Sequence, residues 1–222
     1  PGGRAVQSTD NGLFEFEQAA DNALCVPGDS AKGRRIVDLL PSAQARSGYR
    51  ADVEHELDRH LLIPGLVNAH THSAMSLFRG LADDLPLMTW LNDHVWPAEA
   101  RWVHEEFVAD GSRLAIAEML RSGTTCFNDM YFFADATLDV CREVGMRASL
   151  GIIIIEFESA WATSVDHYIE KGLALLQEWG DDPLIGFTLS PHSPYTVSDD
   201  TLARIAALSR ERDLPVHMHL LE

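Results

Sequence analysis

The sequence predicts an α/β fold of the (β/α)8 TIM-barrel type, and three observations support this prediction. From Leu61 onward, short β-rich runs alternate with longer helical patterns, which is typical of βα units around a parallel sheet. Five strands and four crossovers fill about 160 residues, which fits the first five units of a barrel of roughly 250 residues. The turn after the first strand reads His70-Thr71-His72 instead of a glycine-rich turn, which disfavours a doubly wound open sheet.

The first part of the chain is Gly-rich and weakly patterned. Within residues 1–57 the best segment is Gly33–Pro41, which could form a strand ended by proline. The later strands are better defined, because each is a β-rich run bounded by turn residues. The expected strands are Leu62–His72, Thr124–Asp129, Arg147–Ile155, Leu184–His192 and Pro215–Leu220.

Helices are expected between these strands. Glycines that follow the periodic stretches end two of them, and serines mark N-terminal caps. The expected helices are Ala134–Val144, Ser164–Trp179, a third opened by Ser198 and continued over Thr201–Arg212, and one near Glu105–Arg121. The last belongs to a long insert, Ser73–Gly123, which carries three tryptophans. Loops at that end of a βα barrel build active sites.

Composition and charge limit the class of protein. Of the 222 residues, 46% are hydrophobic and 23% charged, as in ordinary globular proteins. The longest apolar runs are far shorter than the roughly 20 residues of a membrane helix, and no leader pattern opens the sequence, so we expect a cytoplasmic protein. A formal charge of −17 repels phosphate and anionic lipid. We therefore expect no nucleic acid and no membrane as partners, while the charge says little about a small-molecule substrate; a homo-oligomer is allowed for.

The three cysteines do not indicate a disulfide framework or a thiolate zinc site. Cys25, Cys126 and Cys141 are odd in number and lack C-x-x-C spacing. We expect buried thiols.

Two histidines are the first candidates for chemistry. His70 and His72 stand two apart at the end of a predicted strand, so both side chains leave the same face. This arrangement suits one metal ion, since zinc binds imidazole nitrogen and hydrolytic sites keep one position open for water. An H-x-H pair alone is a weak signal in a chain with 10 histidines.

The surrounding sequence makes the signal specific. The run Leu62–His72 resembles the first-strand signature of the amidohydrolase superfamily, in which both histidines bind metal. Further segments resemble the branch that contains methylthioadenosine and S-adenosylhomocysteine deaminases. They are Met75–Gly80, Asp83–Leu87, Trp90-Leu91, Trp96–Glu99, Gly123–Thr125, Asp129–Tyr131, Pro191–Ser198 and His217–Glu222. The resemblance covers residues 61–222.

The resemblance implies a domain organisation and a reaction. Residues 1–60 would form part of a small β-sandwich, and residues 61–222 would form strands 1 to 5 of an incomplete metal-dependent hydrolase barrel. The implied activity is hydrolytic deamination of 5′-methylthioadenosine or S-adenosylhomocysteine, with one divalent metal, Zn2+ being favoured over Fe2+. A bridging lysine is not expected, because that position reads Pro191-His192.

Roles for single residues follow from the resemblance. His219 would be the third metal ligand, and Glu222 the catalytic carboxylate that handles protons at the purine ring. Trp90 matches the aromatic that flanks the nucleoside, Glu99 the carboxylate that accepts bonds from the ribose hydroxyls, and His192 a substrate contact. These pairings are chemically reasonable, since a carboxylate offers two acceptors to a diol and an indole offers rigid apolar area.

Other polar residues receive weaker interpretations. Asp129 could orient a metal-bound histidine, although a helix cap or plain turn is favoured. His217 is interpreted as lining. Surface or packing roles are expected for His94, His104 and His167, and no role is given to His55 or His60.

Two alternatives remain open at this stage. One is another hydrolase of the branch, such as a triazine chlorohydrolase or a guanine or cytosine deaminase, which would not need Glu99 as a ribose carboxylate. The other is a non-catalytic fragment. The family completes its site with a histidine after the sixth strand and an aspartate after the eighth, so a chain ending at Glu222 is expected to have an incomplete site and to be inactive alone.

Overall fold

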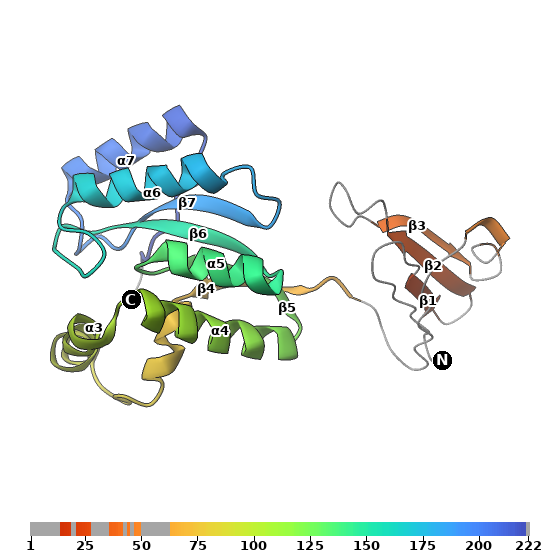
Figure 1. Cartoon of the computed structure of the whole chain (residues 1–222), viewed down its shortest axis with the longest axis horizontal. Helices are drawn as coiled ribbons and strands as arrows, with labels where there is room; N and C mark the ends of the chain where they lie inside the picture. Colours follow the sequence, from red (N-terminus) through yellow and green to blue (C-terminus); the bar gives the residue numbers. More distant parts are fainter. Residues whose placement is uncertain are drawn as a thin grey trace. The chain divides into compact units, whose positions relative to one another are not determined.

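The computed structural model describes residues 14–18, 21–27, 36–41, 44, 47–49 and 63–220. The chain divides into two compact units, Pro1–Pro64 and Gly65–Glu222. The first contains three antiparallel strands in the order β1-β2-β3 (Figure 1). These are β1 Phe14–Gln18, β2 Asp21–Pro27 and β3 Ile36–Pro41. The strand expected to end at Pro41 is confirmed as β3, and membership of a β-sandwich stays a prediction.

The second unit is built on a parallel sheet. Its four strands follow chain order, β4-β5-β6-β7, and neighbouring strands are parallel (Figure 1). They are β4 Leu66–Thr71, β5 Thr124–Met130, β6 Arg147–Ile154 and β7 Ile185–Pro191. Because the strands run the same way, all their carboxyl ends lie at one edge of the sheet. The first four strands of the second unit are thus confirmed, and closure into a barrel stays a prediction.

The segment expected as a fifth strand is less regular than predicted. Its only assigned pairing among the described residues is a single parallel bridge between Leu189 and Val216. Backbone hydrogen bonds nevertheless carry it along β7, from Leu189 N to Pro215 O at 2.9 Å and from His217 N to Leu189 O at 3.0 Å. Val216 remains 48% exposed. A segment supported mainly from one side gains fewer ladder bonds, which explains its irregularity.

Helices cover the outer side of this sheet (Figure 1). They are α4 Glu105–Arg121, α5 Ala134–Val144, α6 Val165–Trp179 and α7 Asp199–Arg212. The predicted caps are confirmed, because the hydroxyl of Ser164 accepts from His167 N and that of Ser198 from Thr201 N. Gly145 ends α5 with φ 73°, a left-handed conformation that glycine adopts without strain.

The core lies between the strands and these helices. Its largest cluster is mainly aliphatic and includes Leu150, Ile152 and Ile154, each at most 1% exposed. A glycine allows α6 to approach the sheet closely, since a Cβ at Gly172 would lie 2.0 Å from Ile152 Cγ2. A rigid sheet of this kind fixes the positions of the side chains at its carboxyl edge.

The insert between β4 and β5 folds into short helical segments before α4. They are η2 Ser73–Phe78, α2 Leu87–Trp90, the π-helical turn η3 Leu91–Val95 and α3 Trp96–Trp102. The segment η2 packs against α4 at Gly111, where a Cβ would lie 2.4 Å from Ala74 O. The absence of a side chain at Gly111 therefore lets α4 support the turn that follows β4.

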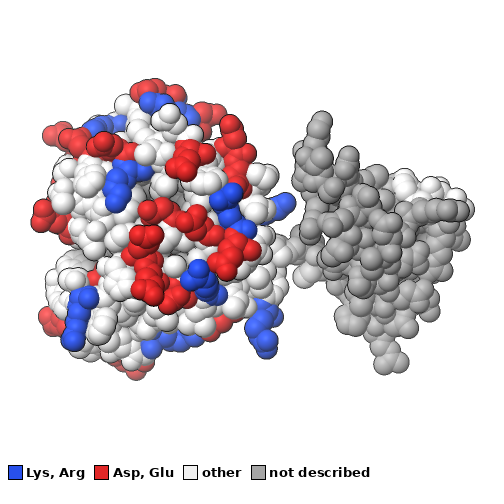
Figure 2. Space-filling view, in the orientation of Figure 1, with Lys and Arg blue, Asp and Glu red and all other residues white. Residues whose placement is uncertain are grey.

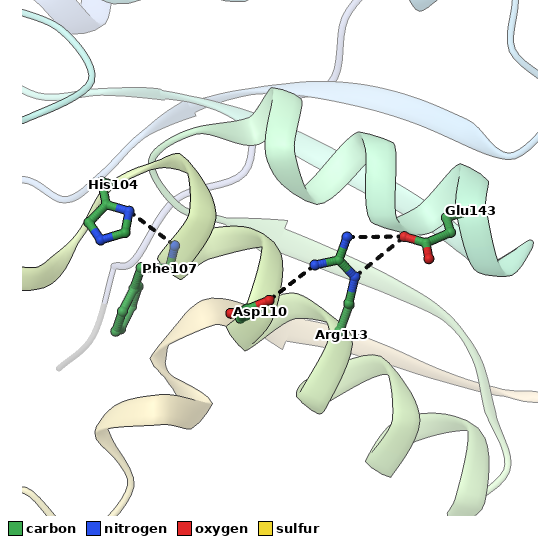
Figure 3. A network of polar contacts seen from close by, with 5 residues as sticks. All are labelled: His104, Phe107, Asp110, Arg113 and Glu143. Atoms are coloured by element: carbon green, nitrogen blue, oxygen red, sulfur yellow. Dashed lines mark hydrogen bonds and ion pairs between the residues drawn. The ribbon is translucent and has the colours of Figure 1, made fainter.

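The outer surface carries mixed charges. Figure 2 shows Asp and Glu side chains gathered over the helix-covered face of the second unit, with Lys and Arg among them. Arg113 of α4 bonds Glu143 of α5 at 3.1 Å and Asp110 at 3.1 Å (Figure 3). Exposed ion pairs of this kind contribute little to stability. At the start of α4, His104 Nδ1 accepts from Phe107 N at 3.3 Å, so this histidine caps a helix.

Within the described part of the chain, no helix is both long and apolar enough to cross a membrane. The expected cytoplasmic location stays a prediction.

Candidate functional site

Three histidines from two distant segments converge at the carboxyl edge of the sheet. His70 lies in β4, His72 directly follows it, and His219 lies on the segment alongside β7. One ligand nitrogen from each ring lies within 4.8 Å of the others. The ring of His219 is 4.9 Å from that of His70 and 5.1 Å from that of His72, centroid to centroid. The structure therefore brings together the three residues predicted as metal ligands.

The ring of His72 is held by the neighbouring strand. Its Nδ1 lies 2.6 Å from the carbonyl oxygen of Met130, at the end of β5. A carbonyl can only accept, so Nδ1 carries the proton and donates it. In the neutral ring, Nε2 then keeps the lone pair that a metal requires. Sequence analysis missed this role of Met130, because a main-chain carbonyl leaves no mark in the residue type.

Asp129, the residue before Met130, bonds the residues on either side of His72. Its Oδ1 accepts from Thr71 Oγ1 and from Ser73 N, each at 2.7 Å, and its Oδ2 from Ser73 Oγ at 3.1 Å. Ser73 is the first residue of η2, so Asp129 bonds the main chain where that segment begins, and its interpretation as a helix cap or plain turn stays a prediction. Burial raises the pKa of Asp129, and the bonds from Thr71 and Ser73 oppose that rise.

A cavity opens beside the histidines and encloses about 660 Å³ of empty volume, including its open mouth. His72, His219 and the three predicted substrate contacts, Trp90, Glu99 and His192, all line it. Apolar side chains form most of the remaining wall. They include Met75, Leu87, Trp96, Ile153, Ile155 and Phe157. Among the described residues that line the cavity there is no lysine or arginine.

Glu99 is the acidic side chain of this wall. It lies on α3, and its Oε1 accepts a hydrogen bond of 2.8 Å from the hydroxyl of Tyr131. Burial raises the pKa of Glu99 to about 7, and the bond from Tyr131 limits the rise. Burial likewise raises the pKa of Tyr131, with the charge of Glu99 adding to the effect. At neutral pH the carboxyl is therefore poised between its two protonation states.

Tyr131 was given no role by sequence analysis. It is 4% exposed and follows the end of β5 directly. The signal that could have identified it is its place, because side chains just after a parallel strand face the same edge as the histidines. Its partner Glu99 comes from the insert, and no local pattern links the two.

His192 follows β7 at the same edge. Its Nδ1 lies 3.2 Å from both Ser193 Oγ and Thr196 Oγ1, and its ring is 5.0 Å from that of His219. The backbone bond from His219 N to His192 O, 3.0 Å long, ties the two residues together. His192 thus contacts the histidine cluster through His219 and itself forms part of the cavity wall.

The remaining candidates are placed as follows. His217 is half-buried, and burial lowers its pKa, with the charges of His70 and His72 adding to this. It is not part of the histidine cluster and is not among the described residues that line the cavity, so its interpretation as lining stays a prediction. His167 Nδ1 accepts from Thr163 N at 3.3 Å, a local contact. Glu222, predicted as the catalytic carboxylate, lies outside the described residues.

The second unit is thus an α/β fold whose parallel sheet carries, at its carboxyl edge, three histidines that could hold a metal ion. The chain belongs to the Amidohydrolase family, which it matches over residues 61–222.

Relatives of known name match the same region. A 5-methylthioadenosine/S-adenosylhomocysteine deaminase of Saccharophagus degradans is 49% identical over 187 residues, covering 84% of this chain and 42% of that protein. The crystal structure of an adenosine deaminase from Xanthomonas campestris with bound zinc is 46% identical, with a TM-score of 0.78, over 89% of this chain and 44% of that one. The chain therefore spans about two fifths of the length of the curated relatives it matches.

A more distant solved structure shares the fold. The atrazine chlorohydrolase of Arthrobacter aurescens in complex with zinc has a TM-score of 0.74 and 20% identity, over 90% of this chain and 49% of that one. This likeness shows the fold alone.

Proposed function

We propose that this chain contributes the metal centre and nucleoside pocket of a hydrolytic deaminase that converts an adenosine-like nucleoside to its inosine analogue and ammonia. The observation that carries the proposal is that two of the clustered histidines, His72 and His219, line the same cavity as Glu99. The names of the relatives support the same reaction.

The donor set fits a divalent metal. Three imidazoles converge, and the Met130 carbonyl fixes the proton of His72 on Nδ1, which commits Nε2 to coordination. Imidazole ligands suit Zn2+, which we favour over Fe2+, in a site with a single ion. The bound ion would lower the pKa of a water molecule toward about 7. In a closed barrel these ligands would lie at its mouth.

The other residues would bind the nucleoside. Glu99 accepts hydrogen bonds from the two ribose hydroxyls once it is ionised, and Tyr131 holds its carboxyl in place. Trp90 packs against the nucleoside, and His192 contacts it near the ring that reacts. Glu222 donates a proton to a ring nitrogen, so that negative charge does not build up on the purine when water adds to the carbon that bears the amine, which then leaves as ammonia.

The test is a deaminase assay on full-length protein carrying Glu99→Gln. Gln keeps the size of the side chain but offers one acceptor oxygen in place of two to the diol. We expect the kcat/KM for 5′-methylthioadenosine to fall about 10- to 100-fold, as for two weakened hydrogen bonds of about 1 kcal/mol each. The matched control is Glu170→Gln, an exposed position on α6, which should leave kcat/KM unchanged.

The same assay distinguishes the alternatives. Free guanine, cytosine and a chlorotriazine lack the ribose, so turnover of any of these in preference to nucleosides, unaffected by Glu99→Gln, would support another hydrolase of the branch. Absence of turnover of every compound by zinc-loaded full-length protein would support a non-catalytic metal-binding protein.

A further inference from the structure

Two residues at the end of β5 form hydrogen bonds with three consecutive residues, 71–73, where β4 ends and η2 begins. Asp129 bonds Thr71 and Ser73, and the Met130 carbonyl accepts a hydrogen bond from Nδ1 of His72, which lies between them. The parallel pairing of Thr71 with Asp129 sets this register. Asp129 thus bonds the residues before and after His72, and its neighbour Met130 bonds the imidazole ring of His72.

His72 needs this support because its backbone is irregular. With φ −123° and ψ 73°, it lies between the strand and helical regions, at the point where β4 ends and η2 begins. Neither a strand ladder nor a helix fixes its direction there. The bond from Ser73 N to Asp129 Oδ1 supplies the main-chain restraint that secondary structure does not.

The restraint is anchored in the core. Asp129 is 3% exposed, and a chain of buried hydroxyls continues from Ser73 to Ser112 of α4 at 3.2 Å and on to Thr137 of α5 at 3.0 Å. All three hydroxyl residues are at most 3% exposed. Satisfied buried polar networks of this kind are rigid.

We infer that Asp129 is a positioning residue for the metal centre, acting through His72 by fixing the main chain on both sides of it. The inference rests on the metal centre proposed above. It differs from a purely structural cap in one respect: loss of Asp129 should change the orientation of His72 and the affinity for metal, in addition to stability.

Three substitutions in the 222-residue chain separate these roles. Asp129→Ala leaves the Thr71 hydroxyl and the Ser73 amide without their acceptor. Asp129→Asn is the conservative variant, because its Oδ1 can still accept both bonds while its amide donates to Ser73 Oγ. Thr201→Val is the control, since it removes a buried hydroxyl of α7 that bonds Ser198 and Glu156 and lies outside this network.

Two measurements are made on each variant. Titration with Co2+, followed by its visible absorption, gives a metal affinity; we expect Asp129→Ala to weaken it about 10- to 100-fold, the range for residues that orient a metal ligand. Asp129→Asn and Thr201→Val should stay close to wild type. Without metal, the ¹⁵N shifts of the His72 ring report its tautomer, which should be Nδ1–H in wild type and mixed in Asp129→Ala.

The outcomes decide between the two proposals. A folded Asp129→Ala chain with wild-type Co2+ affinity and wild-type ¹⁵N shifts overturns the positioning role. If this variant does not fold, Thr71→Val replaces it, with weaker Co2+ binding expected and unchanged values overturning the inference. A wild-type chain that binds no Co2+ overturns the metal centre, and the His72 tautomer then decides the positioning role by itself.

Discussion

Replacement of Glu99 by glutamine should stabilise the fold at alkaline pH. Burial raises the pKa of Glu99 from its ordinary value of 4.5 to about 7. Between these two pKa values the folded state therefore holds a proton that the unfolded chain has released, so folding requires proton uptake. Above the folded pKa, folding instead buries the ionised carboxylate, which is also unfavourable. The stability of the wild type should fall between pH 4.5 and about 7 from this group and remain lowered above it.

The size of the effect follows from the same values. One pKa unit corresponds to 1.36 kcal/mol, so the rise from 4.5 to about 7 represents about 3 kcal/mol at pH 8 or above. In Glu99→Gln this cost disappears, while the amide oxygen can still accept the bond from Tyr131. For a protein of this size the gain corresponds to a rise in Tm of roughly 6–12 °C.

The assay is urea unfolding of the 222-residue chain at several pH values, followed by circular dichroism. We expect Glu99→Gln to match wild type at pH 4.5 and to exceed it progressively up to pH 8. Glu170→Gln, exposed on α6, is the control and should show no such trend. A stability difference for Glu99→Gln that does not change with pH would refute the account of Glu99 as a carboxyl destabilised by burial.

Three further predictions concern the frame, the metal and the substrate. Gly111→Ala should lower the free energy of unfolding by about 1–3 kcal/mol in urea melts, because its Cβ would lie 2.4 Å from Ala74 O; an unchanged value would contradict the close packing of α4 on η2. Excess Zn2+ should raise the Tm of the wild-type chain and EDTA should reverse the rise. At a free Zn2+ concentration of 100 times the Kd for Zn2+, the free energy of unfolding should increase by about 2.7 kcal/mol. His219→Ala should respond much less, and an equal response would disprove the shared site. Full-length protein should show a higher kcat/KM for 5′-methylthioadenosine than for S-adenosylhomocysteine, since apolar Ile155 and Phe157 line the cavity and no described lysine or arginine there can pair with the homocysteine carboxylate; equal values would reject this preference.

The raised pKa of Glu99 connects stability with the proposed function. A carboxyl that destabilises the empty fold at neutral pH is typical of binding and catalytic sites, where burial and specific partners shift pKa values. In the proposed pocket, the ribose hydroxyls would supply donors to the ionised form and lower its pKa again. Nucleoside affinity is therefore expected to rise with pH through about 7.

Sequence analysis identified the histidines for a local reason. The H-x-H spacing and its flanking residues form one continuous run, and strand alternation places both rings on one face. Helix bounds were also predictable, because caps and periodicity act within a few residues; α4 and α5 begin and end where the sequence indicated. The family resemblance added His219, Trp90 and Glu99, which spacing alone would not connect.

The sequence by itself thus determined the parallel α/β frame of the second unit, the bounds of its helices and the residue types available at the carboxyl edge. Only the tertiary structure decided which hydrogen-bond partners orient the site side chains at that edge. The Met130 carbonyl on His72, the hydroxyl of Tyr131 on Glu99 and the bonds of Asp129 join residues that are far apart in sequence. Such bonds depend on the register between neighbouring strands and on the packing of the insert against the sheet. Local propensity and periodicity extend over only a few residues, so they carry no information about these pairings.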